Sequence, residues 1–244
     1  MIIKHFSELP DSDPSLKAYL NYNPPHKEYT LKQNKKGITS RDPEETDRGG
    51  WRGYDRVYSF YLQHLKDDKL NLLEIGVEKG YGLLAWASYF YNSRIFGVEK
   101  NTKYLPFYDY IQKKYLAASR ISFNFHDSTQ PPKWSDNYFD IIIDDGSHLP
   151  EDQVNTFVMY WPLLKPGGFY FIEDISTRYT NPSMNIVFDK LMECALEGNA
   201  VSVYSHTNSG WMEILENETL RKVYKVKEGT PFIAEDYIAV IKKK

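Results

Sequence analysis

The chain is short of cysteine, of long apolar runs and of net charge, and each shortage excludes a class of protein. Its single cysteine, Cys194, excludes a disulfide within the chain, and its apolar helical surroundings favour a core residue over a nucleophile. No segment approaches the roughly 18 uninterrupted apolar residues of a membrane span, and the N-terminus lacks the apolar stretch of a secretory signal. The net charge of −3 gives no electrostatic reason to expect nucleic acid. We therefore expect a cytoplasmic protein with neither a nucleic-acid partner nor a membrane.

Prolines and polar residues set the first part of the chain apart. Residues 1–45 carry Pro10, Pro14, Pro24, Pro25 and Pro43 and show little periodic pattern, which predicts an N-terminal arm or lid. Residues 46–244 are long enough for one α/β domain. Because such an arm has no core of its own, the chain is a candidate for a homo-oligomer.

A helical apolar face that includes Tyr54 and Tyr58 begins near residue 51, and repeated strand–helix units follow it. The unbroken isoleucine run at 141–143 indicates a central parallel strand that is buried on both faces. These units predict the α/β class: a Rossmann-like, doubly wound sheet of about seven strands, mostly parallel with an antiparallel last strand. The expected strands cover residues 70–75, 94–99, 121–125, 139–144, 168–172, 200–205 and 236–242, and the helices between them include 83–91, 104–118, one from Pro150, and 184–197.

Five of the expected strands end in carboxylates. In an open sheet of this kind, ligands bind outside the carboxyl ends of the strands, so these acids mark the candidate site. A single acid there could arise by chance, whereas five strand ends form a stronger signal. The acids are Glu74, Glu99, Asp127, the pair Asp144 and Asp145, and the pair Glu173 and Asp174.

The stretch LLEIGVEKGYG at 72–82 predicts a ligand-binding turn between strand and helix, although turn glycines are also common in tight connections. Glu99, 25 residues after Glu74, is placed to accept both hydroxyls of a ribose. A dinucleotide would need a third glycine and no acid near its phosphates, but position 78 is Glu. A sulfonium cofactor suits an acidic rim, and Asp127 could accept from an adenine amino group. The pattern favours methyl transfer over hydride transfer.

The segments FDIIIDDGSH (139–148) and LKPGGFYFIED (164–174) both end in adjacent acids. Carboxylates on neighbouring strands about 5 Å apart repel one another unless a cation lies between them or one is protonated. Oxygen ligands favour Mg²⁺ over zinc. The alternative is that each acid caps the next helix or binds nearby amides.

His148 follows Asp145 by three residues and precedes the helix from Pro150. A helix N-terminus disfavours a positive imidazole, so a neutral ring that could accept a proton is expected. A bound metal would make an acceptor hydroxyl more acidic and ease that transfer. The alternative is a helix-capping or structural histidine.

Over residues 70–242 the chain resembles the class I S-adenosylmethionine-dependent methyltransferases. Glu74, Gly76, Gly80, Glu99 and Asp127 match that superfamily's successive cofactor motifs. The resemblance implies S-adenosylmethionine as cofactor. The candidate cofactor-binding residues are Thr46, Asp47, Glu74, Gly76, Gly80, Glu99, Asp127, Ser128 and Asp144.

DGSH, the later ED pair and TDRGG at 46–50 resemble a narrower group, the metal-dependent sugar O-methyltransferases related to the macrocin and mycinamicin enzymes. This resemblance implies that Asp145, Glu173 and Asp174 hold Mg²⁺. It further implies that His148 is the general base and that Asp145 takes part in catalysis. The acceptor would be a sugar hydroxyl on a glycan or glycosylated small molecule.

Three other interpretations stay open. A catechol-type diol could use the same metal, and a methyltransferase-like fold could serve as a non-catalytic binding module. The retention of candidate acids and base argues against the module. Iron-dependent oxygenase chemistry ranks last, because it usually needs two histidines and only His148 is suitably placed.

Overall fold

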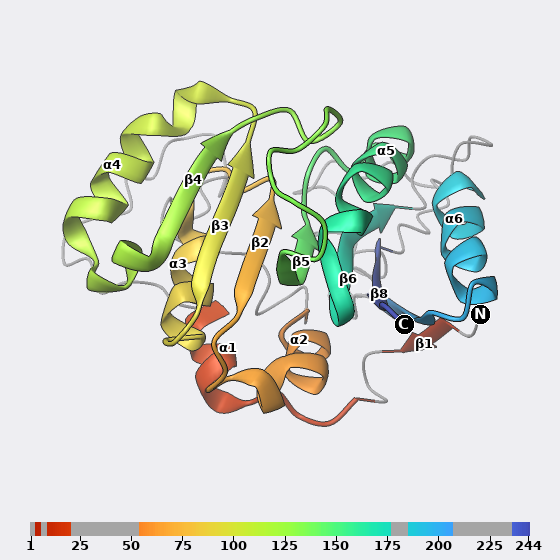
Figure 1. Cartoon of the computed structure of the whole chain (residues 1–244). Helices are drawn as coiled ribbons and strands as arrows, with labels where there is room; N and C mark the ends of the chain where they lie inside the picture. The colour runs from red at the N-terminus through yellow and green to blue at the C-terminus, as the bar shows by residue number, and fades with distance from the viewer. Residues whose placement is uncertain (1–2, 6–8, 21–53, 177–184, 207–235) are drawn as a thin grey trace, which may run out of the picture.

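The computed structural model describes residues 3–5, 9–20, 54–176, 185–206 and 236–244, which form one eight-stranded sheet flanked by helices (Figure 1). The strands are β1 (Ile3–His5), β2 (Asn71–Ile75), β3 (Arg94–Glu99), β4 (Ile121–Phe125), β5 (Phe139–Asp144), β6 (Leu164–Ser176), β7 (Ala200–His206) and β8 (Asp236–Lys242). The helices are α1 (Pro14–Leu20), α2 (Tyr54–Leu62), α3 (Tyr81–Tyr89), α4 (Leu105–Lys114), α5 (Pro150–Tyr160) and α6 (Asn185–Leu196). Short 3₁₀ turns cover Gln63–Leu65, Thr102–Tyr104, Leu116–Arg120 and Trp161–Leu163.

The strand order is β1-β7-β8-β6-β5-β2-β3-β4. Within this sheet β8 runs antiparallel to both of its neighbours, β6 and β7, and the remaining pairs are parallel. The predicted doubly wound sheet with an antiparallel last strand is therefore confirmed, with β1 added at one edge. The order reverses between β2 and β5, and such a switch point is where open α/β sheets bind ligands.

Apolar side chains on the two faces of the sheet belong to two separate cores. Ile141 and Ile143 of β5 join the core under α1, α2, α3 and α4, whereas Ile142 joins the core under α5 and α6. Because successive side chains on a strand point to opposite faces, an unbroken apolar run serves both cores. This burial confirms the prediction for a central strand and fixes β5 rigidly beneath the site.

Strand β6 is longer than the predicted 168–172. Gly167 has a φ of +79°, and the sequence Pro-Gly-Gly at 166–168 is typical of a turn, which is why the pattern predicts a later start. In the fold, Leu164 nevertheless pairs with Phe139 of β5, and a register shift between Phe139 and Ile141 absorbs the irregularity.

Two elements precede residue 21, where the sequence predicted only an arm or lid. β1 pairs in parallel with β7, so that Ile3 lies opposite Val203. Helix α1 packs against α3 and buries Leu16 and Leu20 completely. A strand of three residues and a helix of seven are too short to show a period. The boundary at residue 46 stays a prediction, because residues 21–53 lie outside the described part of the chain.

No helix among the described residues is long and apolar enough to cross a membrane.

Candidate active site

The ends of β2 and β5 come into close contact at the switch point. The Asp145 amide donates to the Ile75 carbonyl at 2.9 Å, and the Gly76 amide donates to the Val98 carbonyl of β3 at 2.9 Å. A Cβ on Gly76 would lie 2.1 Å from the backbone oxygen of Asp145, and Gly76 has a φ of +81°. Only glycine fits both the conformation and the approach. The turn after β2 therefore packs directly against the backbone at the end of β5.

Two pockets open side by side over these strand ends, and both are lined by Gly76, Glu99, Lys100 and Gly146. Of the predicted cofactor residues, Asp127, Ser128 and Asp144 line the first pocket together with the shared Gly76 and Glu99. The second pocket holds Glu78, Asp145, His148 and Asp174.

The remaining predicted cofactor residues lie elsewhere. Glu74 is buried within β2, and Gly80, with a φ of +84°, precedes the first turn of α3; neither lines the two pockets. Thr46 and Asp47 lie outside the described residues.

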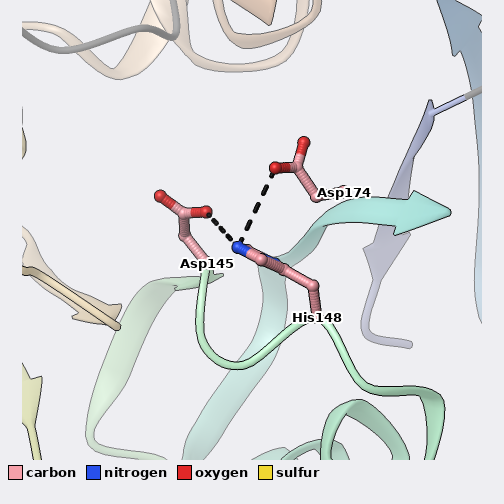
Figure 2. A group of neighbouring side chains, drawn as sticks. All are labelled: Asp145, His148 and Asp174. Atoms are coloured by element: carbon pink, nitrogen blue, oxygen red, sulfur yellow. Dashed lines mark ion pairs between the residues drawn. The ribbon is translucent and has the colours of Figure 1, made fainter. Parts of the chain in front are cut away.

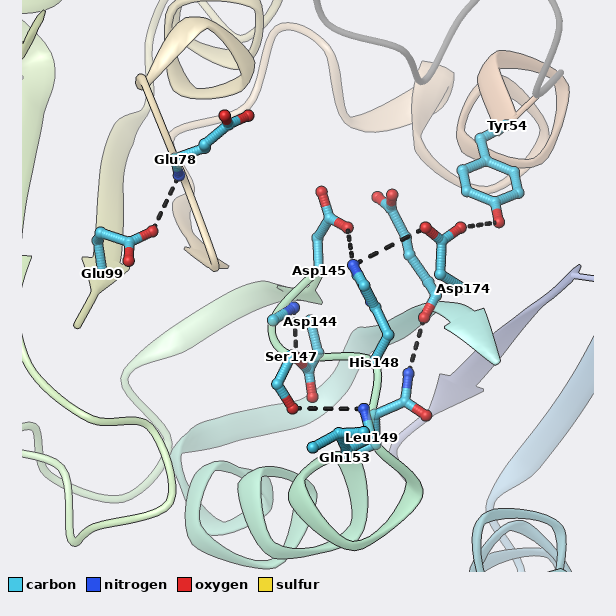
Figure 3. A network of polar contacts seen from close by, with 12 residues as sticks. Tyr54, Glu78, Glu99, Asp144, Asp145, Ser147, His148, Leu149, Gln153 and Asp174 are labelled. Atoms are coloured by element: carbon cyan, nitrogen blue, oxygen red, sulfur yellow. Dashed lines mark hydrogen bonds and ion pairs between the residues drawn. The ribbon is translucent and has the colours of Figure 1, made fainter. Parts of the chain in front are cut away.

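Backbone amides orient the acids of the first pocket. Glu99 Oε2 accepts from the amide of Glu78 at 3.0 Å (Figure 3), and Glu99 Oε1 accepts from that of Asn101 at 2.9 Å. Asp127 Oδ1 accepts from the amide of Thr129 at 3.0 Å and from its hydroxyl at 2.8 Å. These bonds from Thr129 hold the pKa of the Asp127 carboxyl below its usual range. Asp127 therefore presents a negative charge to the pocket near neutral pH.

Asp145, His148 and Asp174 form a compact group in the second pocket, in which one ligand atom from each lies within 4.8 Å of the others (Figure 2). His148 Nε2 is 3.7 Å from Asp145 Oδ1 and 3.9 Å from Asp174 Oδ2. His148 and Asp174 have φ values of +58° and +52°, a region that non-glycine residues adopt rarely. Strained backbone at two members of one group is typical of a functional site.

The loop between β5 and α5 carries His148 to this group. Asp144 Oδ1 accepts from the Gly146 amide at 3.2 Å (Figure 3), and the Ser147 hydroxyl donates to Asp152 at 2.6 Å. The Leu149 amide donates to the Ser147 hydroxyl at 3.3 Å. Asp145 and His148 thus sit at opposite ends of a turn that is tied to the start of α5. The side chain of His148 is 38% exposed, so Nε2 can meet a molecule in the pocket.

Glu173, the third acid predicted for the metal, lies outside this compact group among the described residues. It is 2% exposed, and its Oε1 accepts a short hydrogen bond from the hydroxyl of Tyr58. Tyr54 donates in the same way to Asp174 Oδ1 at 2.6 Å. Sequence reasoning placed both tyrosines on the apolar face of a helix. Their helical spacing is a signal of core packing, and nothing local indicates that they reach the acids.

Asp144 lies beside the group but faces the protein interior. It is 2% exposed, and burial raises the pKa of its carboxyl to about 7. Buried Glu173 and the more distant Asp152 add to the rise through repulsion. Asp144 therefore supports the loop and the wall of the first pocket.

Comparison with known proteins shows similarity to methyltransferases. Residues 73–175 match the family model of a methyltransferase domain. The 8-demethyl-8-(2-methoxy-alpha-L-rhamnosyl)-tetracenomycin-C 3'-O-methyltransferase of Streptomyces olivaceus is 33% identical over 143 residues, covering 54% of this chain and 34% of that protein. Demethylmacrocin O-methyltransferase of Streptomyces fradiae is 32% identical over 164 residues, covering 59% and 39%. The chain spans only about a third to two-fifths of the length of these curated relatives.

Solved structures show the same fold. MycE methyltransferase from the mycinamycin biosynthetic pathway, in complex with Mg, SAH and mycinamycin VI, has a TM-score of 0.52 at 19% identity over 81% of this chain and 51% of that one. The [4+2]-cyclase SpnF has a TM-score of 0.56 at 15% identity over 78% and 83%. The likeness to a cyclase shows that the fold by itself does not decide the reaction.

Residues 73–175 match the methyltransferase-domain model, and the sheet order and the site at the strand ends agree with the class I methyltransferase fold that the sequence predicted. Within that class, the chain is similar to the sugar O-methyltransferases of the macrocin and mycinamicin type.

Proposed function

We propose that the protein transfers a methyl group from S-adenosylmethionine to a sugar hydroxyl, with Mg²⁺ bound at the second pocket. The observation that carries this proposal is the junction of the two pockets. Glu99 lines both pockets and could accept from a ribose there, and Asp145, His148 and Asp174 line the second pocket together with the shared Gly76 and Gly146. The similarity to enzymes that methylate rhamnosyl and macrocin substrates supports the sugar as acceptor.

The first pocket suits the nucleoside end of the cofactor. Each oxygen of Glu99 accepts one amide bond, which leaves a further lone pair on each for a ribose hydroxyl. Asp127 and Ser128 line the part where adenine would lie. The acids Glu78 and Glu99 at the junction would favour a sulfonium over a phosphate.

The donor set of the second pocket fits a hard divalent ion. Asp145 and Asp174 contribute carboxylate oxygens from separate strand ends within one compact group, and such oxygens are the ligands that Mg²⁺ prefers. These two residues would hold the ion, with Glu173 as the further ligand that the family resemblance implies. When bound, Mg²⁺ would offset the charge of the acids and increase the acidity of an acceptor hydroxyl.

His148 would act as the general base. Its Nε2 points into the pocket between the two carboxylates, where an acceptor hydroxyl would be held. As the hydroxyl oxygen bonds to the methyl carbon, the carbon–sulfur bond would break to leave S-adenosylhomocysteine, and Nε2 of His148 would take the hydroxyl proton. The protein's contribution is mainly orientation of the two reactants and stabilisation of charge.

The direct test is an acceptor panel. The purified full chain, S-adenosylmethionine and Mg²⁺ would be incubated with rhamnosides and glycosylated macrolides on one side and catechols on the other, with release of S-adenosylhomocysteine measured. We expect turnover with a glycoside, and its loss in EDTA. Turnover with catechols and with no glycoside would mean that the acceptor is a catechol-type diol and not a sugar. If calorimetric titration detected no binding of S-adenosylmethionine, the result would favour a non-catalytic binding module.

One substitution separates the metal from the cofactor. Asp145→Asn should abolish turnover while S-adenosylmethionine binding is retained, because Asp145 lines only the second of the two pockets. Asp109→Asn, an exposed acid on α4, removes the same charge away from the site and should leave turnover unchanged. Full activity of Asp145→Asn would contradict the metal-dependent mechanism.

A further inference from the structure

Helix α2 presents two tyrosine hydroxyls, one turn apart, to the acid pair at the end of β6. Tyr54 and Tyr58 are four residues apart, so they share one face of the helix. Tyr54 donates to Asp174 Oδ1 at 2.6 Å, and Tyr58 donates to Glu173 Oε1 (Figure 3 shows the first of these). Both tyrosines are almost fully buried. Two adjacent acids are thus each paired with a hydroxyl from the same helix, more than a hundred residues away in sequence.

The bond from Tyr54 determines which oxygen of Asp174 faces the pocket. Oδ1 accepts from Tyr54, whereas Oδ2 is the atom 3.9 Å from His148 Nε2. A hydrogen bond from a hydroxyl to a carboxylate at this distance is charge-assisted and strongly directional. It therefore holds the carboxyl plane with one oxygen turned to the helix and the other turned to Asp145 and His148.

The backbone beneath the acids needs such support. The antiparallel pairing of β6 with β8 is interrupted between Ile172 and Ile175, which brackets the acid pair. Asp174 also has a φ of +52°. The Gln153 side chain of α5 donates to the Glu173 carbonyl at 2.9 Å from another side. Where the strand ladder is interrupted, Gln153 of α5 holds the backbone and the two tyrosines of α2 hold the carboxylates.

We propose that Tyr54 and Tyr58 are positioning residues that orient Asp174 and Glu173 for the divalent ion. This inference rests on the proposed function, because it takes these acids as metal ligands. Hydrogen bonds to ligating groups commonly set metal affinity, and losing one weakens binding about 10- to 100-fold. Removing a hydroxyl should therefore lower metal affinity while the aromatic ring keeps its packing.

The test measures binding of Mn²⁺ to the full chain, with free Mn²⁺ followed by electron paramagnetic resonance. Tyr54→Phe and Tyr58→Phe are compared with Tyr61→Phe as matched control. Tyr61 lies on the same helix, but its hydroxyl bonds to that of Tyr204 at 2.7 Å and to neither acid. Circular dichroism of the metal-free variants reports whether each is folded.

We expect the Mn²⁺ Kd to rise roughly 10- to 100-fold in Tyr54→Phe and to rise also in Tyr58→Phe, with Tyr61→Phe unchanged. The two variants act through different acids, so either one that folds provides the test. Wild-type affinity in both folded variants would overturn the inference and leave the proposed function intact. Equal weakening in Tyr61→Phe would also overturn it, because the effect would then be one of helix packing. A wild-type chain that binds no Mn²⁺ would overturn the metal site of the proposed function itself.

Discussion

Asp144 and Asp145 are identical, adjacent residues with different surroundings. Asp145 lines the open second pocket beside His148, whereas Asp144 is buried beneath the first. The pKa of the Asp144 carboxyl is about 7, chiefly because burial penalises its charge. A buried carboxyl of this kind links the stability of the fold to pH.

The pH dependence of unfolding tests this link. The pKa of Asp144 in the folded chain, about 7, lies above the ordinary value of 3.8, so between those values the unfolded chain binds fewer protons and stability falls as pH rises. Below pH 3.8 the stability that Asp144 contributes to the fold is fully present. Above about pH 7 that contribution falls no further. As the pH rises across this window, the unfolding free energy of Asp144→Asn should therefore increase relative to that of wild type. The increase should be about 1.4 kcal/mol for each pH unit, a few kcal/mol in all.

Urea unfolding in EDTA between about pH 4 and pH 8, a range that spans the shift in the Asp144 pKa, would measure this difference. Asp109→Asn serves again as an exposed control and should run parallel to wild type. An Asp144→Asn curve that also runs parallel to wild type would show that the carboxyl is charged throughout.

At the scale of elements, the close approach of the ends of β2 and β5 depends on Gly76. Gly76 and Gly167 have nearly the same positive φ but differ in the space around an added Cβ. Gly76 has a φ of +81° and a neighbour at 2.1 Å from an added Cβ, whereas Gly167 has a φ of +79° and nothing within 4 Å. The pair separates backbone strain from steric contact.

Gly76→Ala should lower the unfolding free energy more than Gly167→Ala does. The strain of a positive φ, about 1–3 kcal/mol, is common to both, and the overlap with the Asp145 backbone is added only at Gly76. Because Gly76 lines both pockets, S-adenosylmethionine affinity should fall in Gly76→Ala alone. Denaturant unfolding and calorimetry would measure the two effects. An equal decrease in unfolding free energy in both variants would mean that the ends of β2 and β5 can move apart without loss of stability.

At the scale of the whole molecule, a ligand held by both halves of the sheet should stabilise the entire domain. The first pocket is lined from β2, β3, the loop after β4, and α5, so bound cofactor would connect elements on both sides of the switch point. A ligand at a hundred times its Kd adds about 2.7 kcal/mol to the unfolding free energy.

S-adenosylhomocysteine should therefore raise the Tm, by roughly 2–4 °C for each kcal/mol in a chain of this size. NAD⁺ at the same concentration is the control, since the acids Glu78 and Glu99 would repel its pyrophosphate. Differential scanning calorimetry would report both shifts. A Tm that rises with NAD⁺ and not with S-adenosylhomocysteine would contradict the assignment of the first pocket.

The sequence alone determined those features that depend on short-range pattern. Strands at 94–99, 121–125, 139–144 and 236–242 have the bounds predicted, because runs of apolar residues and the turns that end them are local. The family and the strand-end acids followed from such segments. His148 and Asp145 could be placed together because only two residues separate them.

Tertiary structure alone decided the features that depend on contacts between distant residues. The pairing of β1 with β7 places Ile3 opposite Val203, and Tyr54 meets Asp174 across 120 residues. No period or spacing encodes such contacts, since a tyrosine on an apolar helix face looks the same whether its hydroxyl reaches solvent or a buried acid. Helix α2 covers the core and, through its two tyrosine hydroxyls, also binds the acids at the end of β6.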